Sequence, residues 1–118
     1  MFFTEHEEEF ANLLIRLGIR KNIAKVLVYL ANIGEVSTRQ VERGTDLRQP
    51  EVSLAMRYLL DRDWVRSYQS HRSSQGRPVK IYNLAKPIAD IIGVIEDEKQ
   101  QEVLQQIKLT KKLREYVC

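Results

Sequence analysis

The sequence has few of the residues that mark several large classes of protein. Cysteine occurs once in 118 residues, at the last position, so no internal disulfide can form. No stretch approaches the roughly 18 apolar residues that a membrane span needs. The first residues lack the basic and apolar regions of a signal peptide. These absences predict a cytoplasmic protein with no membrane segment.

Signatures of catalysis and of metal binding are also missing. The sequence offers no Ser-His-Asp or Cys-His set, no paired carboxylates in a plausible context and no phosphate-binding glycine loop. Its two histidines, His6 and His71, lie far from each other and from Cys118. We therefore expect a protein that is not an enzyme and that needs neither a metal nor another cofactor.

The charge is low and unevenly placed. Nineteen basic and sixteen acidic residues give a net charge of +3. Residues 1–34 contain four of each kind and residues 86–118 contain six of each, so both blocks are neutral. Residues 64–85 contain no acid, and a polyanion is expected to touch this segment. Its basic residues are Arg66, Arg72, Arg77 and Lys80.

Capping and apolar spacing predict two helices in the first third of the chain. Thr4 and Glu7 form a capping-box pattern that begins the first helix, and Gly18 ends it. A second helix is expected at residues 21–32, where a broad apolar face predicts a place at the centre of the core. Gly34 follows as its stop. The apolar stripe of the first helix consists of Phe10, Leu13, Leu14 and Leu17.

Two short helices joined by a tight turn should follow a candidate strand at residues 35–36. Ser37 can cap a helix that runs to Arg43 and ends at Gly44. Gln49-Pro50 then suits the start of a helix that continues to about residue 61, because proline is tolerated in the first turn. This arrangement is typical of a helix-turn-helix.

The remaining chain predicts a β-hairpin and a long helix. Residues 64–70 and 79–84 are rich in β-branched and aromatic residues and are joined by a polar, basic loop. Trp64 is expected to be a core or hinge anchor. From Lys86 or Pro87 to about Tyr116, apolar residues follow helical spacing.

Together these segments resemble the winged helix-turn-helix transcription regulators of the MarR, ArsR and TrmB-like groups, of archaeal type. The motifs that carry the resemblance lie at residues 36–41, 49–53, 63–65 and 76–84. It implies a mainly α fold with a small β-hairpin. It also implies a DNA-binding domain at residues 19–85 between an N-terminal helix (1–18) and a long C-terminal dimerisation helix (86–118).

The helix at residues 49–61 is expected to read DNA with the side that faces away from the core. Arg57 could form two hydrogen bonds to guanine, and Gln49 could form two to adenine. Leu54 could contact a thymine methyl group. Ser53 can serve either a base or a phosphate, and Pro50 lies at the end that enters the major groove.

Other polar residues are better placed for the phosphate backbone. Contacts from Thr38, Arg39 and Arg48 would position the protein without reading sequence. In the hairpin, arginines can enter a narrow minor groove. The hairpin residues predicted to touch DNA are Arg72, Arg77 and Lys80.

The long C-terminal helix predicts a homodimer. Its distal part, residues 103–117, would expose an apolar face unless a partner helix covers it. Helix 1, with Phe2, Phe3, Phe10 and Leu14, is a candidate partner from the same or a second chain. Two-fold pairing would place two recognition helices one DNA turn apart, about 34 Å, on a palindromic operator in double-stranded DNA.

One alternative is a winged helix used as a protein-interaction module, because Glu51 and Asp46 make the recognition helix nearly neutral. Two further questions stay open at the level of sequence. One is whether a small-molecule effector acts on the protein, and the other is whether Cys118 pairs with its counterpart in a dimer.

Overall fold

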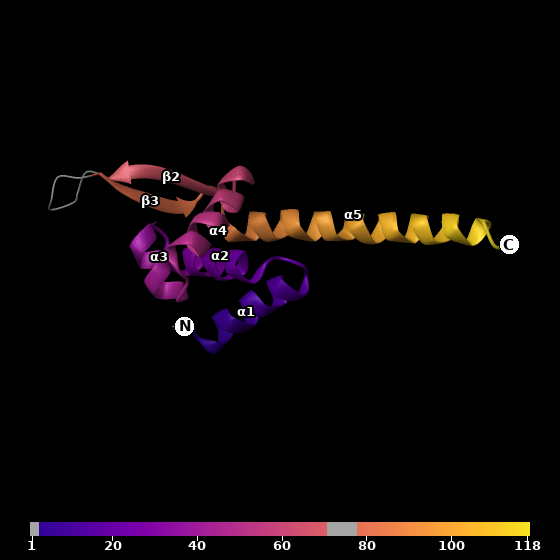
Figure 1. Ribbon diagram of the computed structural model, residues 1–118, viewed down its shortest axis with the longest axis horizontal. Helices are drawn as coiled ribbons and strands as arrows, with labels where there is room; N and C mark the ends of the chain where they lie inside the picture. The colour runs from indigo at the N-terminus through magenta and orange to yellow at the C-terminus, as the bar shows by residue number, and fades with distance from the viewer. Residues whose placement is uncertain (1–2, 71–77) are drawn as a thin grey trace. The chain divides into compact units, whose positions relative to one another are not determined.

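The computed structural model describes residues 3–70 and 78–118 (Figure 1). The chain divides into two compact units, one ending at Lys86 and the other beginning at Pro87. Arg72 and Arg77, and also Phe2, lie outside the described residues. Among the described residues, no helix is both long and apolar enough to cross a membrane.

The first unit begins with α1 (Glu5–Arg16) packed against α2 (Lys21–Ile33). The predicted capping box is present: the Thr4 backbone N–H donates to Glu7 Oε1 at 3.0 Å, and Glu7 N–H donates to Thr4 Oγ1 at 3.2 Å. Gly18 turns the chain with φ +104°. The stripe predicted for α1 is wrong in part, because Leu13 is 52% exposed and Leu17 is 47% exposed.

The centre of the first unit is α2, as its broad apolar face predicts. Six of its side chains are buried, and Leu27 is fully so, because α1 covers one side of the helix while α3 and α4 cover others. The buried residues of α2 are Ile23, Ala24, Val26, Leu27, Val28 and Leu30.

A small antiparallel sheet closes the unit. Its strands are β1 (Val36–Ser37), β2 (Val65–Ser70) and β3 (Val79–Leu84), in the order β1-β3-β2. The short β1 strand therefore adds a third member to the predicted hairpin by pairing with β3. Sequence alone left the inward side of β3 undecided, and the structure buries Tyr82, which is 7% exposed.

Trp64 anchors the start of β2, as expected. Its side chain is 2% exposed and meets the Tyr58 ring edge to face, with ring centroids 6.2 Å apart and planes at 76°. The Arg62 guanidinium carbon lies 4.3 Å from the centroid of the Trp64 ring, within the range of a cation–π contact. The last turn of α4 and the sheet are therefore joined through one aromatic cluster.

The second unit is the single helix α5 (Ile88–Glu115), which begins directly after Pro87. Every residue from 101 to 118 is exposed. Including α5, the described residues form five helices and three strands, so the predicted mainly α fold with a small β component is confirmed.

Candidate nucleic-acid interface

The helix-turn-helix consists of α3 (Thr38–Thr45) and α4 (Gln49–Asp61). Ser37 caps α3 reciprocally with Gln40: Ser37 N–H donates to Gln40 Oε1 at 2.8 Å, and Gln40 N–H donates to Ser37 Oγ at 3.3 Å. The sequence prediction that Gly44 ends this helix is wrong, because α3 continues to Thr45. Asp46 makes the turn instead, in the left-handed conformation with φ +58°.

Gly44 is needed inside α3 for a different reason. A methyl group placed on Gly44 would overlap ring carbons of Tyr29. The absence of a side chain at this position lets α3 approach α2 closely, and this contact helps to set where α3 holds the following turn.

One side of α4 is packed into the unit and the other is open. The buried side consists of Val52, Ala55, Met56 and Leu59. We call the opposite set the exposed side of α4. Among the described residues of the first unit, Leu54 is the most exposed large apolar residue, at 67%. The exposed side of α4 comprises Gln49, Pro50, Ser53, Leu54 and Arg57, and the exposed acid Asp61 ends the helix.

Two polar residues on the exposed side of α4 are joined. Gln49 Nε2 donates to Ser53 Oγ at 2.8 Å, one helical turn away. The hydrogen bond holds the Gln49 amide along the helix, with its carbonyl oxygen left as an acceptor. The residues of α4 that the sequence predicts to contact DNA therefore lie together on one side of the helix. Arg48, also predicted, is exposed directly before it.

Glu51, the acid in the first turn of α4, faces away from that side. Its Oε1 accepts a hydrogen bond from the Arg48 backbone N–H at 2.9 Å, and its Oε2 accepts one from Asn22 Nδ2 at 3.4 Å. A carboxylate here also complements the positive end of the helix dipole. Glu51 thus stabilises the start of α4 and links it to α2, so its charge is not offered to a ligand on the exposed side.

The start of α3 carries two of the predicted phosphate ligands. Thr38 is half-buried as the first residue of the helix, and Arg39 is exposed as the second. Helix N-termini present free backbone N–H groups and a partial positive charge. Arg39 adds a formal charge at the same end.

In the described part of the hairpin, basic residues occupy opposite faces of the sheet. Lys80 pairs with Gln69, and Arg66 pairs with Asn83. Directly opposed residues share a face and successive residues alternate, so Lys80 lies on the Tyr82 face and Arg66 on the other. Lys80 is exposed, with Nζ 5.8 Å from the Tyr82 ring centroid. Arg66, although counted in the basic segment, was not among the predicted site residues.

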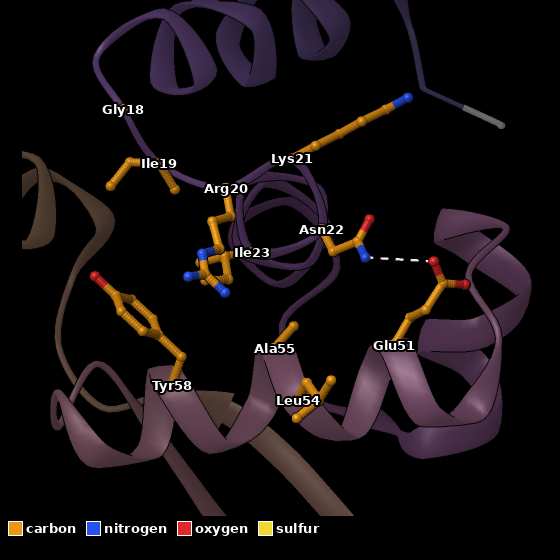
Figure 2. Close-up of a pocket in the computed structure, with 10 residues that line it drawn as sticks. All are labelled: Gly18, Ile19, Arg20, Lys21, Asn22, Ile23, Glu51, Leu54, Ala55 and Tyr58. Atoms are coloured by element: carbon orange, nitrogen blue, oxygen red, sulfur yellow. Dashed lines mark hydrogen bonds between the residues drawn. The ribbon is translucent and has the colours of Figure 1, made fainter.

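A cavity of about 550 Å³ lies between the start of α2 and the flank of α4. Figure 2 shows Asn22 reaching Glu51 across it, whereas Lys21 points away from α4. Leu54 and Tyr58 line the α4 wall, and exposed Arg20 lies at the α2 end. Sequence reasoning missed Arg20 and Lys21 as neighbours of α4, because the block count set them against the acids of α1.

The described residues contain no group of three or more His, Cys, Asp or Glu side chains that could hold a metal ion. The thiol of Cys118 is exposed and forms no disulfide. The chemistry that the exposed side of α4 offers is therefore hydrogen bonding and apolar contact, with positive charge supplied by Arg57.

No protein-family model matches the sequence, and no curated protein matches it either. Solved structures do. A possible transcriptional regulator from Methanosarcina mazei matches with a TM-score of 0.60 at 19% identity, over 81% of this chain and 82% of its own. The repressor MarR matches with a TM-score of 0.57 at 14% identity, over 87% of this chain and 73% of its own.

TrmBL2, an archaeal chromatin protein whose structure shows a novel mode of DNA binding, matches with a TM-score of 0.72 at 14% identity. The match covers 94% of this chain and 40% of TrmBL2. At these identities the likeness shows the fold. The chain has the winged helix-turn-helix fold found in MarR and TrmB-type transcription regulators, which confirms the resemblance drawn from the sequence.

Proposed function

We propose that the protein is a sequence-specific DNA-binding transcription regulator. The observation that carries this proposal is the exposed side of α4, which presents hydrogen-bonding, basic and apolar groups on the second helix of a helix-turn-helix. The likeness in fold to transcription regulators supports it. In this fold the second helix is the element that enters the major groove.

The side chains of α4 then have separate roles. Arg57 forks onto a guanine edge, Leu54 meets a thymine methyl group, and the amide of Gln49 reads adenine. Ser53, held by Gln49 at 2.8 Å, orients that amide or takes a phosphate itself. The sequence selectivity of the protein lies mainly in these four residues.

The contacts to the DNA backbone come from the starts of α3 and α4 and from the β2–β3 hairpin, which is the wing of this fold. Arg48 precedes α4, while Thr38 and Arg39 begin α3; all three serve phosphates, which position a protein without reading sequence. Lys80 grips the backbone from the described part of the wing. We extend this role to Arg72 and Arg77, which lie outside the described residues.

We further propose that the protein acts as a homodimer. Residues 19–85 form the DNA-binding domain, and the N-terminal helix (1–18) and the C-terminal helix (86–118) supply the dimer contacts. Leu14 is buried against α2, so the α1 residues that remain free for a second chain are Leu13 and Leu17. A small-molecule effector stays a prediction; an occupant of the cavity between α2 and α4 would touch Leu54 on the exposed side of α4.

Fluorescence anisotropy with operator DNA tests the regulatory proposal. The operator is first selected from a random oligonucleotide pool, and its affinity is compared with that of scrambled DNA. Arg57→Ala should weaken operator binding by about 5- to 150-fold, which corresponds to about 1–3 kcal/mol for one bidentate base contact. The control is Arg16→Ala in α1, which removes one exposed arginine far along the chain from α4 and should leave affinity unchanged.

Salt dependence separates the backbone contacts from the base contacts. Lys80→Ala should weaken binding to operator and scrambled DNA alike, and reduce the slope of log affinity against log salt by about 1. No preference for the selected operator, together with equal affinities of the wild type and Arg57→Ala, would contradict the proposal.

The second candidate is a winged helix that binds another protein. The 67% exposure of Leu54 favours it, because an apolar residue at the centre of an open helix face suits a protein contact as well as a thymine methyl group. In this case Leu54→Ala abolishes capture of the partner protein, and Arg57→Ala has no effect on DNA binding.

A further inference from the structure

The helix α5 carries opposite charges in its two halves. Residues 90–102 contain five carboxylates and one lysine, a net charge of −4. Residues 103–114 contain four basic residues and no acid, a net charge of +4. Lys99 Nζ pairs with Glu102 Oε2 at 3.2 Å within the acidic half, which leaves the excess of acid there intact. The basic residues are Lys108, Lys111, Lys112 and Arg114.

Exposed apolar side chains lie at the junction of the two halves. Val103 is 54% exposed, Leu104 52% and Ile107 45%. Exposed apolar residues in contiguous patches mark contact surfaces. A partner for this part of α5 must therefore offer an apolar centre, with a basic segment for the acidic half and an acidic segment for the basic half.

A second copy of α5 meets all three requirements in one orientation only. We propose that two α5 helices pair antiparallel, with the two-fold axis crossing the pair at the level of Gln105. This pairing deepens the homodimer of the proposed function and rests on it. Antiparallel pairing places the acidic half of each helix beside the basic half of the other. Parallel pairing would align each half with its own copy, and like charges facing each other are destabilising.

The proposed register follows from helical spacing. Residues 96, 100, 103, 107, 110 and 114 alternate steps of three and four, which places them along one stripe of the helix. With the axis at Gln105, this stripe pairs with itself. Val103 lies opposite Ile107 of the second copy, Gln100 opposite Thr110, and Glu96 opposite Arg114.

Apolar contact and charge have different roles in this pairing. Exposed ion pairs contribute only about 0–1 kcal/mol each, so the affinity comes mainly from covering Val103 and Ile107. The charges select direction, because the competing parallel arrangement must bring carboxylates together at one end and ammonium groups at the other.

The antiparallel arrangement fixes how far apart the two α5 helices begin. At 1.5 Å per residue, the 17 residues between Ile88 and Gln105 place the two starts of α5 about 51 Å apart along the pair. By the same rise, the two Cys118 residues lie about 39 Å apart, so they cannot form a disulfide within the pair.

Paired cysteines test both direction and register. In a Cys118→Ser background, Gln100→Cys and Thr110→Cys are combined in one chain, oxidised without DNA and digested with trypsin. Peptides from residue 100 and residue 110 should be found linked by mass spectrometry. The two cysteines of one chain lie about 15 Å apart along the helix, beyond disulfide reach, so this link must join two chains. The control for random collisions is Gln101→Cys alone: residue 101 lies on the side of the helix away from the stripe, and it should stay unlinked.

Other outcomes overturn the proposal. Links of 100 to 100 and of 110 to 110 would show parallel helices. A monomer in sedimentation at micromolar concentration, or a dimer without the 100–110 link, would show that α5 does not pair in this way. Because the experiment contains no DNA, its result is independent of operator binding. Failure of the anisotropy test alone would refute the regulatory function and leave the pairing standing.

Discussion

Glu51→Ala is expected to destabilise the first unit and the start of α4 with it. The substitution removes the acceptor of the Arg48 backbone N–H at 2.9 Å and the acceptor of Asn22 Nδ2 at 3.4 Å. It also removes a negative charge from the first turn of the helix. All three losses act on the element that carries Gln49 and Pro50.

The loss of unfolding free energy in Glu51→Ala follows from these contacts. Loss of a helix cap costs typically about 1 kcal/mol, and loss of a favourable charge at the helix N-terminus costs about 0.3–1 kcal/mol. The Asn22 hydrogen bond is long, and its loss adds at most about 0.5 kcal/mol. A total near 2 kcal/mol lowers the melting temperature of a unit of this size by about 8–16 °C.

The assay is urea unfolding followed by tryptophan fluorescence. Trp64 is the sole tryptophan of the chain and is a buried residue of the first unit, so its signal reports the unfolding of that unit. Glu51→Gln retains an acceptor oxygen and should lose less than half as much stability as Glu51→Ala. Glu35→Ala, at an exposed position, should stay within about 0.5 kcal/mol of the wild type. Equal losses for the two Glu51 variants, or none for either, would refute the capping argument.

Two further predictions concern packing. Gly44→Ala should destabilise the protein by about 1 kcal/mol or more in urea unfolding, because overlap with Tyr29 costs more than the helix propensity gained. Gly93→Ala, where an added methyl group meets nothing, should instead stabilise α5 by about 1 kcal/mol, with a higher helicity and melting temperature as the signals. Leu27→Ala at a fully buried position should cost about 2–5 kcal/mol, whereas Leu13→Ala at 52% exposure should cost little.

The sequence predicted the order and type of the elements because each carries a local signal. The capping boxes at Thr4 and Ser37 and the start of α4 at Gln49-Pro50 all stand where the residue types indicate. The inward position of Trp64 also follows from its size and its place at the start of a strand. Signals of this kind depend on a few neighbouring residues, so they can be read without knowledge of the fold.

The errors arose where a distant contact decides the outcome. Gly44 looks like a helix stop, yet the Tyr29 ring from α2 explains why glycine is needed there. The apolar spacing of α1 predicted burial of Leu13, Leu14 and Leu17, but of these only Leu14 is buried, together with Ala11, on the helix that packs against α2. Which side of an amphipathic helix is covered depends on its neighbours, and no local pattern contains that information.

The site was predictable as a set of residues on one helix, but its electrostatics were not. Glu51 counts against DNA binding when charges are added along the sequence. In the structure it turns toward Asn22 and caps its own helix, so the side of α4 that carries Arg57 has no opposing carboxylate from this residue. Arg20, counted among the compensating charges of the first block, lines the same cavity as Leu54.

Adding up charges over a block of sequence also hides the order of the charges along α5. Residues 86–118 are neutral in sum, which removes them from any search for charged surfaces. A helix, however, fixes the distance between its charges at about 1.5 Å per residue, so two opposite clusters in one helix cannot cancel each other through contact. A second chain with the same order of charges can neutralise both clusters at close range when it runs antiparallel. For a rigid element, the useful quantity is therefore the order of its charges along the axis, and in α5 that order favours an antiparallel second copy.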